Sequence, residues 1–232
     1  MINDPNDEIV RLVQAAGDDP SPAQRQAAGL VRRRFGLALP PPFVDRPRSA
    51  DDATPRRASA ADAAAVAAVK WRSWRSAYRG IVPDDFLDRL PVYPSAAYWV
   101  GLSARPRSQH VLMVAGRRGE VHGMCSAGPT SGDGLDPQQV GEVSTLYIDP
   151  SAQGRGLGAR LLDAVVDQLL DIGFDDVRLW VLRDNEAARR FYERRGWVPD
   201  GAEQAVPLNR TDVALAEVRY RWSAADGLLS DI

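Results

Sequence analysis

The segment Ile148–Ala159 reads IDPSAQGRGLGA and decides the fold. It follows a predicted strand, Glu142–Ile148, and it opens a helix whose apolar residues recur every fourth position from Leu157 to Leu169. Three glycines within five residues remove the Cβ atoms that would keep a ligand away from the backbone. The first-turn N–H groups and the helix dipole then form an anion site suited to a pyrophosphate. Arg155 adds a guanidinium at the rim, whose geometry suits phosphate oxygens.

A glycine loop between a strand and a helix admits two classes of ligand. Gly154 to Ala159 also satisfies the G-x-G-x-x-A dinucleotide fingerprint, and Asp184 lies downstream as a candidate ribose ligand. A doubly wound dinucleotide fold, however, needs several strand–helix units, and only about 70 residues follow the loop. A hairpin is also predicted before the loop. A nicotinamide-dependent oxidoreductase is therefore kept only as the less favoured alternative.

The elements around the loop predict a mixed α/β protein. Hairpin strands come first and strand–helix units follow, so a mixed, mostly antiparallel central sheet flanked by helices is expected. Residues 199–212 are interpreted as a loop. The predicted elements are a short strand at 56–58, a helix from Asp62 to Tyr78, a short helix around Phe86, a hairpin of 111–115 and 121–127, strands at 142–148, 177–181 and 213–222, and helices beginning near Leu157 and at Glu186.

Composition excludes several classes of site. With 29 basic and 31 acidic residues, the net charge of −2 gives no basic surplus for nucleic acid. Lys70 is the only lysine, which rules out a GK[ST] phosphate loop. Cys125 is the only cysteine and there are two histidines, so neither a disulfide nor a Cys- or His-based metal site is expected. No apolar run reaches the roughly 20 residues that cross a bilayer, and the polar N-terminus is unlike a secretory signal. A cytoplasmic protein is expected.

The chain divides unevenly along its length. Residues 1–53 predict a helical extension that ends in a proline-rich linker, and residues 54–232 hold the α/β domain. Arginine outnumbers lysine so strongly that a GC-rich bacterial source is the hypothesis for its origin.

Two motifs make the sequence resemble the GNAT N-acetyltransferase superfamily over about residues 56–222. The family's Q/R-x-x-G-x-G/A signature stands at Gln153–Gly158. Its N-x-x-A-x-x-x-Y-x-x-x-G-F block resembles Asn185–Trp197, with tryptophan in place of the final phenylalanine. Trp74-x-x-x-Tyr78-Arg79-Gly80 resembles a segment frequent in bacterial members. The resemblance implies an α/β (α+β) GNAT-like fold and acetyl-CoA as co-substrate.

The resemblance also assigns residues to the coenzyme. The positions that it places there are Leu146, Tyr147, Ile148, Gln153, Gly154, Arg155, Gly156, Leu157, Gly158, Ala159, Asn185 and Arg189. Backbone N–H groups near Leu146, Tyr147 and Ile148 would polarise the acetyl carbonyl, provided that this strand is splayed from its neighbour as it is in the family.

Acyl transfer to an amine also needs a base and an acid. Glu142, at the start of the strand before the loop, is the candidate base, acting through water. Tyr192 lies two helical turns after Asn185 on the same face and is the candidate acid for the departing thiolate. Phe191 is expected to take the neighbouring core position. Trp74, Tyr78 and Arg79 are candidates for the acceptor site.

The favoured function is an acetyl-CoA-dependent N-acyltransferase that moves an acetyl group to a primary amine by direct transfer in a ternary complex, without a metal. The acceptor would be a small-molecule or peptide amine, and neither nucleic acid nor membrane is an expected partner. A non-catalytic acyl-CoA-binding sensor is the alternative from another class. A homodimer through the C-terminal strand is the hypothesis for the oligomeric state.

Overall fold

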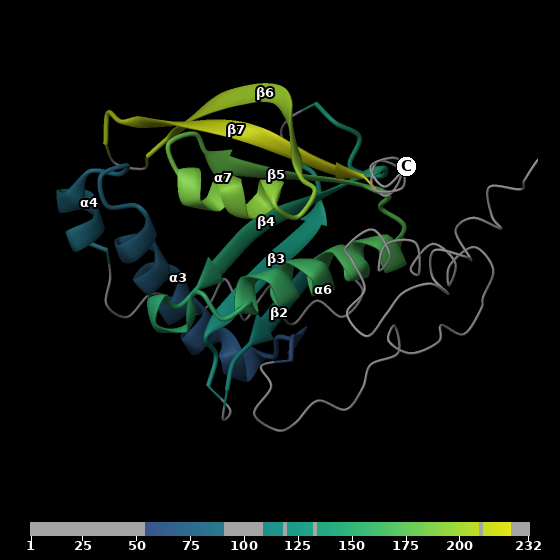
Figure 1. The fold of residues 1–232 in the computed structure, drawn as a ribbon, viewed down its shortest axis with the longest axis horizontal. Coiled ribbons are helices and arrows are strands. Elements are labelled where there is room, and N and C mark those ends of the chain that lie inside the picture. Colours follow the sequence, from purple (N-terminus) through teal and green to yellow (C-terminus); the bar gives the residue numbers. More distant parts are fainter. Residues whose placement is uncertain (1–53, 91–108, 118–119, 132–133, 209–210, 224–232) are drawn as a thin grey trace, which may run out of the picture.

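The computed structural model describes residues 54–90, 109–117, 120–131, 134–208 and 211–223. In this part of the chain seven strands form one sheet in the order β1-β2-β3-β4-β5-β7-β6 (Figure 1). The strands are β1 (Arg56–Arg57), β2 (Val111–Ala115), β3 (Gly123–Pro129), β4 (Val140–Ile148), β5 (Asp176–Leu182), β6 (Val198–Pro207) and β7 (Ala214–Ser223). The helices are α3 (Ala63–Ala77), α4 (Asp84–Asp88), α6 (Leu157–Ile172) and α7 (Glu186–Glu193), with 3₁₀ turns η1 (Ala60–Asp62) and η2 (Pro150–Ala152).

The mixed, mostly antiparallel sheet is confirmed. Among the described strands, β4 and β5 form the only parallel pair, and every other neighbouring pair is antiparallel. A doubly wound dinucleotide-binding fold has a parallel sheet, so this topology excludes the fold on which the oxidoreductase alternative depended. The predicted extension, residues 1–53, lies outside the described residues, and the boundary at residue 54 stays a prediction.

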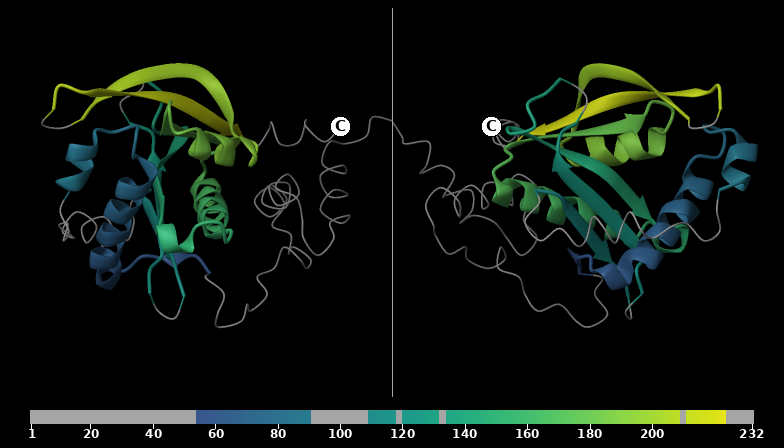
Figure 2. Two further views of the ribbon diagram at one scale, coloured as in Figure 1. Left: turned by 60° about the vertical axis from the view of Figure 1, so that its left-hand side comes forward. Right: turned by 180° about the vertical axis from the view of Figure 1, so that it is seen from behind.

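Helices cover both faces of the sheet (Figure 2). On one face α6 buries seven apolar side chains against β2, β3, β4 and β5, and each fully buried side chain of this kind contributes about 1.5–3 kcal/mol. On the other face α3 packs Val66, Ala67 and Val69 against Leu112 and Met124. The two cores are therefore separated by the sheet itself.

The prediction of a loop at 199–212 is wrong, because residues 198–207 form the strand β6. Pro199 and Gly201 interrupt any strand-like pattern, and nearly all of β6 is exposed, so no alternation of apolar residues marks it. Pairing with β7 stabilises it instead. Since β7 is hydrogen-bonded on both sides, it offers no free edge for a dimer contact by strand pairing.

A bulge changes the course of β4 at its centre. Ser126 pairs with Thr145 and Ala127 pairs with Val143, which leaves Ser144 as an extra residue on β4. The parallel pairing with β5 also ends at Val143, although β4 continues to Ile148 and β5 continues to Leu182. Because bulges bend and twist a strand, the bulge at Ser144 explains why the two strands part at this point.

Candidate active site

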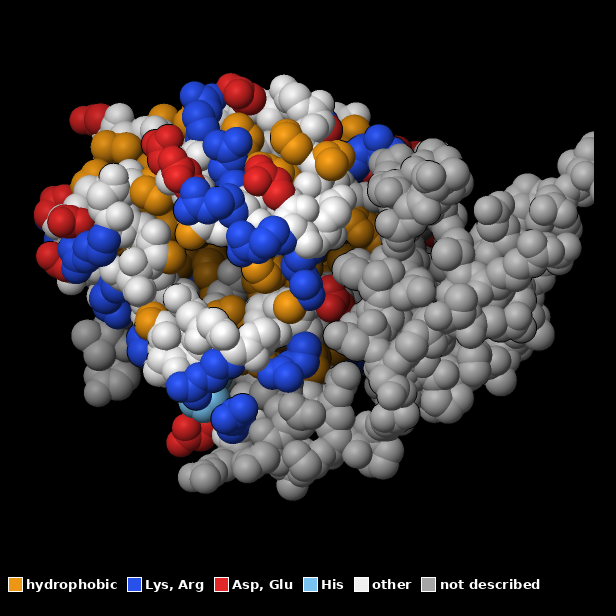
Figure 3. Space-filling model, in the orientation of Figure 1, with side chains coloured by type: hydrophobic (Ala, Val, Ile, Leu, Met, Phe, Trp, Pro, Cys, Tyr) orange, Lys and Arg blue, Asp and Glu red, His pale blue; other side chains and the backbone are white. Residues whose placement is uncertain are grey.

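The parting of β4 and β5 opens into a cavity of about 1110 Å³. Residues from both faces of the sheet line it, including Tyr147 on the α3 face and Tyr192 on the α6 and α7 face. The ends of β4 and β5 that are no longer paired with each other, 144–148 and 180–182, also line the cavity, between Tyr147 and Tyr192. The cavity therefore runs through the sheet. Figure 3 shows a hollow with hydrophobic side chains at its depth and Lys or Arg side chains around its rim.

The glycine loop borders the cavity on the α6 side. Gly154 and Gly156 have φ values of 72° and 74°, in the left-handed region that favours glycine. Gly156 is also the N-cap of α6 and provides no side-chain cap, so the first-turn N–H groups point toward the open space above the loop. The predicted contributors that line the cavity are Gln153, Gly154, Gly156, Leu157, Gly158 and Ala159.

The turn before the loop is held by Asp149. Its carboxylate accepts hydrogen bonds from the N–H and the hydroxyl of Ser151 at 3.0 and 2.7 Å, and it pairs with Arg72 of α3 at 2.5 Å. These bonds lower the pKa of the Asp149 carboxyl, although burial acts in the opposite direction and is the largest single influence. The glycine loop is thereby fixed to α3 across the end of the sheet.

Leu146, Tyr147 and Ile148 all line the cavity on the part of β4 that has left β5. The end of β4 is therefore splayed away from β5, which is the condition stated for the backbone N–H groups of this segment. Leu146 and Ile148 pack in the core under α6, whereas Tyr147 packs against the α3 core. The backbone of this segment thus faces the space between the two strands.

Asn185 and Tyr192 lie together on the cavity wall. The side-chain oxygen of Asn185 accepts a hydrogen bond from the N–H of Ala188 at 3.1 Å and so caps α7. Tyr192 is 8% exposed and belongs to the core, while Phe191 is only partly buried and also lines the cavity. The expectation that Phe191 would take the core position is therefore wrong. Burial raises the pKa of the Tyr192 phenol, which keeps its proton at neutral pH.

Glu142 is not among the residues that line the cavity. It lies on the paired segment of β4, opposite Arg178 of β5, and its carboxylate accepts a hydrogen bond from the Thr130 hydroxyl at 3.2 Å. Any proton that Glu142 takes from the cavity must therefore pass through an intervening group such as water.

Two predicted arginines lie away from the cavity. Arg189 donates hydrogen bonds to the Tyr220 hydroxyl and to the carbonyl of Arg183, both at 3.2 Å. Arg79 is exposed and pairs with Asp84 and Asp88 of α4. Neither lines the cavity, whereas Trp74 and Tyr78 do, with their rings in an edge-to-face contact at 4.9 Å.

Glu217 is a cavity residue that the sequence did not single out. It lies on β7 opposite Leu182, at the parted end of β5, and burial raises the pKa of its carboxyl. The strand itself was predicted, but nothing local to Glu217 marks it. Its position depends on the pairing of β7 with β5, a contact between segments about 35 residues apart.

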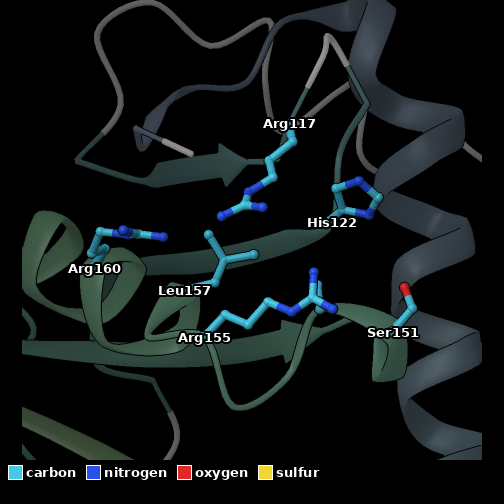
Figure 4. Close-up of a pocket in the computed structure, with 8 residues that line it drawn as sticks. Arg117, His122, Ser151, Arg155, Leu157 and Arg160 are labelled. Atoms are coloured by element: carbon cyan, nitrogen blue, oxygen red, sulfur yellow. The ribbon is translucent and has the colours of Figure 1, made fainter. Parts of the chain in front are cut away.

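Arg155 lines a second, smaller cavity of about 120 Å³ instead of the large one. Arg117, His122 and Arg160 surround the same space, and Figure 4 shows the three arginine side chains around Leu157. Ala152 and Leu157 line both cavities, so the two spaces are neighbours. Guanidinium groups arranged in this way suit an anion, in particular phosphate.

Metal and thiol chemistry have little support among the described residues. No group of three or more His, Cys, Asp or Glu side chains in this part of the chain is arranged to hold a metal ion. Cys125 is buried, and burial raises its pKa, so its thiol is a poor nucleophile. None of the described helices combines the length and hydropathy needed to span a bilayer.

Comparison with known proteins identifies the family. Residues 70–197 match the family model described as "Acetyltransferase (GNAT) family". The chain belongs to the GNAT acetyltransferase family. It is 31% identical over 134 residues to the uncharacterized N-acetyltransferase YuaI of Bacillus subtilis, covering 57% of this chain and 73% of that protein. It is 30% identical over 176 residues to the probable N-acetyltransferase Rv2775 of Mycobacterium tuberculosis, covering 74% of this chain and 95% of that protein.

A solved structure supports the same fold. The PaiA N-acetyltransferase of Thermoplasma acidophilum, crystallised in complex with coenzyme A, matches with a TM-score of 0.58 and 19% identity. The match covers 74% of this chain and 99% of that one. The GNAT fold and the family resemblance stated from the two sequence motifs are confirmed.

Proposed function

We propose that the protein is an acetyl-CoA-dependent N-acetyltransferase that transfers an acetyl group to a primary amine directly, in a ternary complex. The single observation that carries the proposal is the cavity that joins the glycine loop to the opposite face of the sheet. Direct transfer requires two substrates to meet at one point, and a cavity lined by residues from both faces of the sheet has room for one substrate on each side.

The residues present fit coenzyme A. Two glycines in the left-handed conformation, with open space where a Cβ would stand, leave the backbone at the start of α6 accessible to a pyrophosphate. We assign the neighbouring arginine-lined cavity to a further phosphate of the coenzyme. Bound acetyl-CoA supplies an activated acetyl thioester, and the edge of β4 that has parted from β5 offers backbone N–H groups toward its carbonyl.

Tyr192 and Asn185 act on the sulfur side of the reaction. The neutral Tyr192 phenol borders the cavity and can donate its proton to the departing thiolate. Asn185 keeps its amide nitrogen for the coenzyme arm while its oxygen caps α7. Glu142 is the proposed base for the amine, through water, because it lies on β4 just before the strand parts from β5.

Native mass spectrometry of the purified protein, followed by a thiol-release assay with a panel of amines, tests the proposal. We expect coenzyme A to be retained or to bind on addition, and thiol release from acetyl-CoA to accelerate with a subset of the amines. Binding without amine-dependent release across the panel would contradict the enzyme and favour a non-catalytic acyl-CoA sensor.

A further inference from the structure

The α3 face of the large cavity is walled mainly by aromatic side chains. Four aromatic side chains wall this end, and they are Trp71, Trp74, Tyr78 and Phe86. Trp74 makes edge-to-face contacts with Trp71 at 5.7 Å and with Tyr78 at 4.9 Å between ring centroids. Leu208 and Leu215 complete an apolar cluster with them. This end of the cavity is therefore a hydrophobic chamber.

One carboxylate faces that chamber. Among the described residues that line the cavity, Glu217 is the only acidic one. Gln204 of β6 donates a hydrogen bond to its Oε2 atom at 2.7 Å, which fixes the carboxylate in place. The charge of Glu217 also acts on the pKa of both Tyr78 and Tyr147, so the carboxylate lies near the chamber and near the parted end of β4.

We propose that Glu217 is the counter-ion that receives the ammonium group of the acceptor, and that the acceptor is an amine carried on an aromatic or aliphatic frame. This inference rests on the proposed acetyl transfer and names the substrate class of the same site. The frame fills the aromatic chamber and the ammonium pairs with Glu217. Before its nitrogen attacks the thioester beside β4, the ammonium gives one proton through water to Glu142, the proposed base. The departing thiolate takes the Tyr192 proton, and the second proton of the acetylated nitrogen restores the phenol.

The charges around the chamber make a counter-ion necessary. Lys70 and Arg194 also line the cavity, and the Lys70 ammonium lies 4.8 Å from the centroid of the Trp71 ring. Burial lowers the pKa of Lys70, but its charge and that of Arg194 still oppose a further cation. An ammonium removed from water in such surroundings without a partner is strongly disfavoured. The Glu217 carboxylate supplies that partner, and the aromatic faces add cation–π attraction.

The same arrangement selects against other amines. An acceptor with a carboxylate or phosphate beside its amine would meet the repulsion of Glu217. A small, strongly hydrated amine would leave the aromatic walls uncovered and gain little from burial. Selectivity for apolar amines therefore follows from the side chains of α3, α4 and β7 together.

Transfer kinetics with three probe amines test the selectivity. The probes are 2-phenylethylamine, ethanolamine and 4-aminobutyrate, each measured by thiol release from acetyl-CoA. We expect kcat/KM to be at least tenfold higher for 2-phenylethylamine than for either of the others. Equal values, or a preference for 4-aminobutyrate, would overturn the inference.

Two substitutions test the carboxylate. Glu217→Gln keeps the shape of the side chain and its contact with Gln204, and it is expected to raise the KM for 2-phenylethylamine about tenfold to a hundredfold with the KM for acetyl-CoA unchanged. Glu203→Gln is the matched control, because Glu203 lies on the adjacent strand β6, is paired with Arg183 and does not line the cavity. An unchanged KM for 2-phenylethylamine in Glu217→Gln would contradict the role of Glu217.

Calorimetric titration of 2-phenylethylammonium into the coenzyme A-loaded protein separates this inference from the proposed function, because it needs no turnover. Binding that Glu217→Gln weakens and Glu217→Asp partly restores would support the inference even if no amine were acetylated, in which case only the proposed transfer would fail. Transfer to other amines without any binding of 2-phenylethylammonium would overturn the inference and leave the transfer intact.

Discussion

The two faces of the sheet are built in different ways, although one cavity joins them. The α6 face takes its glycine loop from one continuous segment, Gln153–Ala159, and adds the single helix α7. The α3 face collects its lining from α3, α4, β4 and β7, which are far apart in the chain. The difference teaches that the proposed coenzyme end of the cavity is determined locally, while the proposed acceptor end depends on how the whole sheet assembles. Substitutions on each face should therefore affect different kinetic constants.

Tyr192→Phe gives the largest expected effect. Removing the phenolic hydroxyl takes away the proposed acid, so kcat should fall about a hundredfold, a typical contribution of general acid catalysis. The KM for acetyl-CoA should stay near the wild-type value, because the ring still fills its place in the core. Steady-state kinetics across both substrates measure this. Turnover at the wild-type rate would remove Tyr192 from the chemistry.

Gly156→Val should damage the coenzyme end alone. A β-branched residue at a φ of 74° opposes the loop conformation that presents the N–H groups, so coenzyme affinity should fall about thirtyfold, equivalent to about 2 kcal/mol. Gly201→Val is the control, since Gly201 has a φ of 87° on β6 and does not line the cavity. Equal losses of coenzyme affinity in both variants, measured by calorimetry, would point to general destabilisation.

Trp74→Ala is the counterpart on the other face. It removes one wall of the aromatic chamber, so the KM for an apolar amine should rise about tenfold while the KM for acetyl-CoA is unchanged. Trp222→Ala removes a tryptophan that does not line the cavity and serves for comparison. A rise in the KM for acetyl-CoA instead would show that the two faces are not separable.

Arg117→Ala should have a smaller effect on coenzyme A affinity, and this effect should depend on the 3′-phosphate of the coenzyme. Loss of its guanidinium from the second cavity should weaken coenzyme A binding about fivefold to tenfold. Dephospho-coenzyme A, which lacks the 3′-phosphate, should bind the variant and the wild type equally well. Arg89→Ala removes an exposed arginine elsewhere and controls for net charge. An equal loss of affinity for coenzyme A and dephospho-coenzyme A would show that the second cavity does not bind the 3′-phosphate.

The smallest effect concerns the stability of the α3 face. Arg56 forms two hydrogen bonds with Asp62 at the start of α3 and holds the pKa of that carboxyl well below its usual value. A carboxyl with a lowered pKa in the folded state stabilises it above the unfolded pKa, and this contribution is lost as the pH falls. Asp62→Asn should therefore cost about 1 kcal/mol of unfolding free energy at pH 7, because Arg56 is half exposed. Denaturant titrations should show the cost shrinking below about pH 4; a pH-independent cost would contradict the ion pair.

The local structure on the α6 side of the cavity was largely predictable from the sequence. The glycine spacing and the start of α6 are local properties, and Asn185 caps α7 where a helix start was expected. The prediction was less successful for Arg189, because its partner Tyr220 lies on β7, about 30 residues away. The burial of Tyr192 in the core, where Phe191 was expected, also depends on tertiary packing against Trp197 and Tyr220.

The acceptor end was mostly beyond prediction. Trp74 and Tyr78 were identified as acceptor candidates within the W-x-x-x-Y-R-G segment and line the cavity, but Arg79, next in sequence, pairs with α4 instead. Glu217 reaches the cavity only because β7 inserts between β5 and β6, and β6 itself carries no strand pattern. Non-local strand order is not encoded in any short window of sequence, so no local signal marked Glu217 as a cavity residue.

The parting of β4 and β5 at Ser144 has a thermodynamic consequence. Because β4 and β5 part early, they form fewer hydrogen bonds with each other than their lengths allow, and a space lies between their ends. This space exists only in the folded chain, so a ligand that fills it binds the folded state and not the unfolded one. Such a ligand raises the unfolding free energy by about 2.7 kcal/mol at a hundred times its Kd. The melting temperature should therefore rise with ligand concentration as the cavity fills. It measures ligand binding even in variants that have lost turnover.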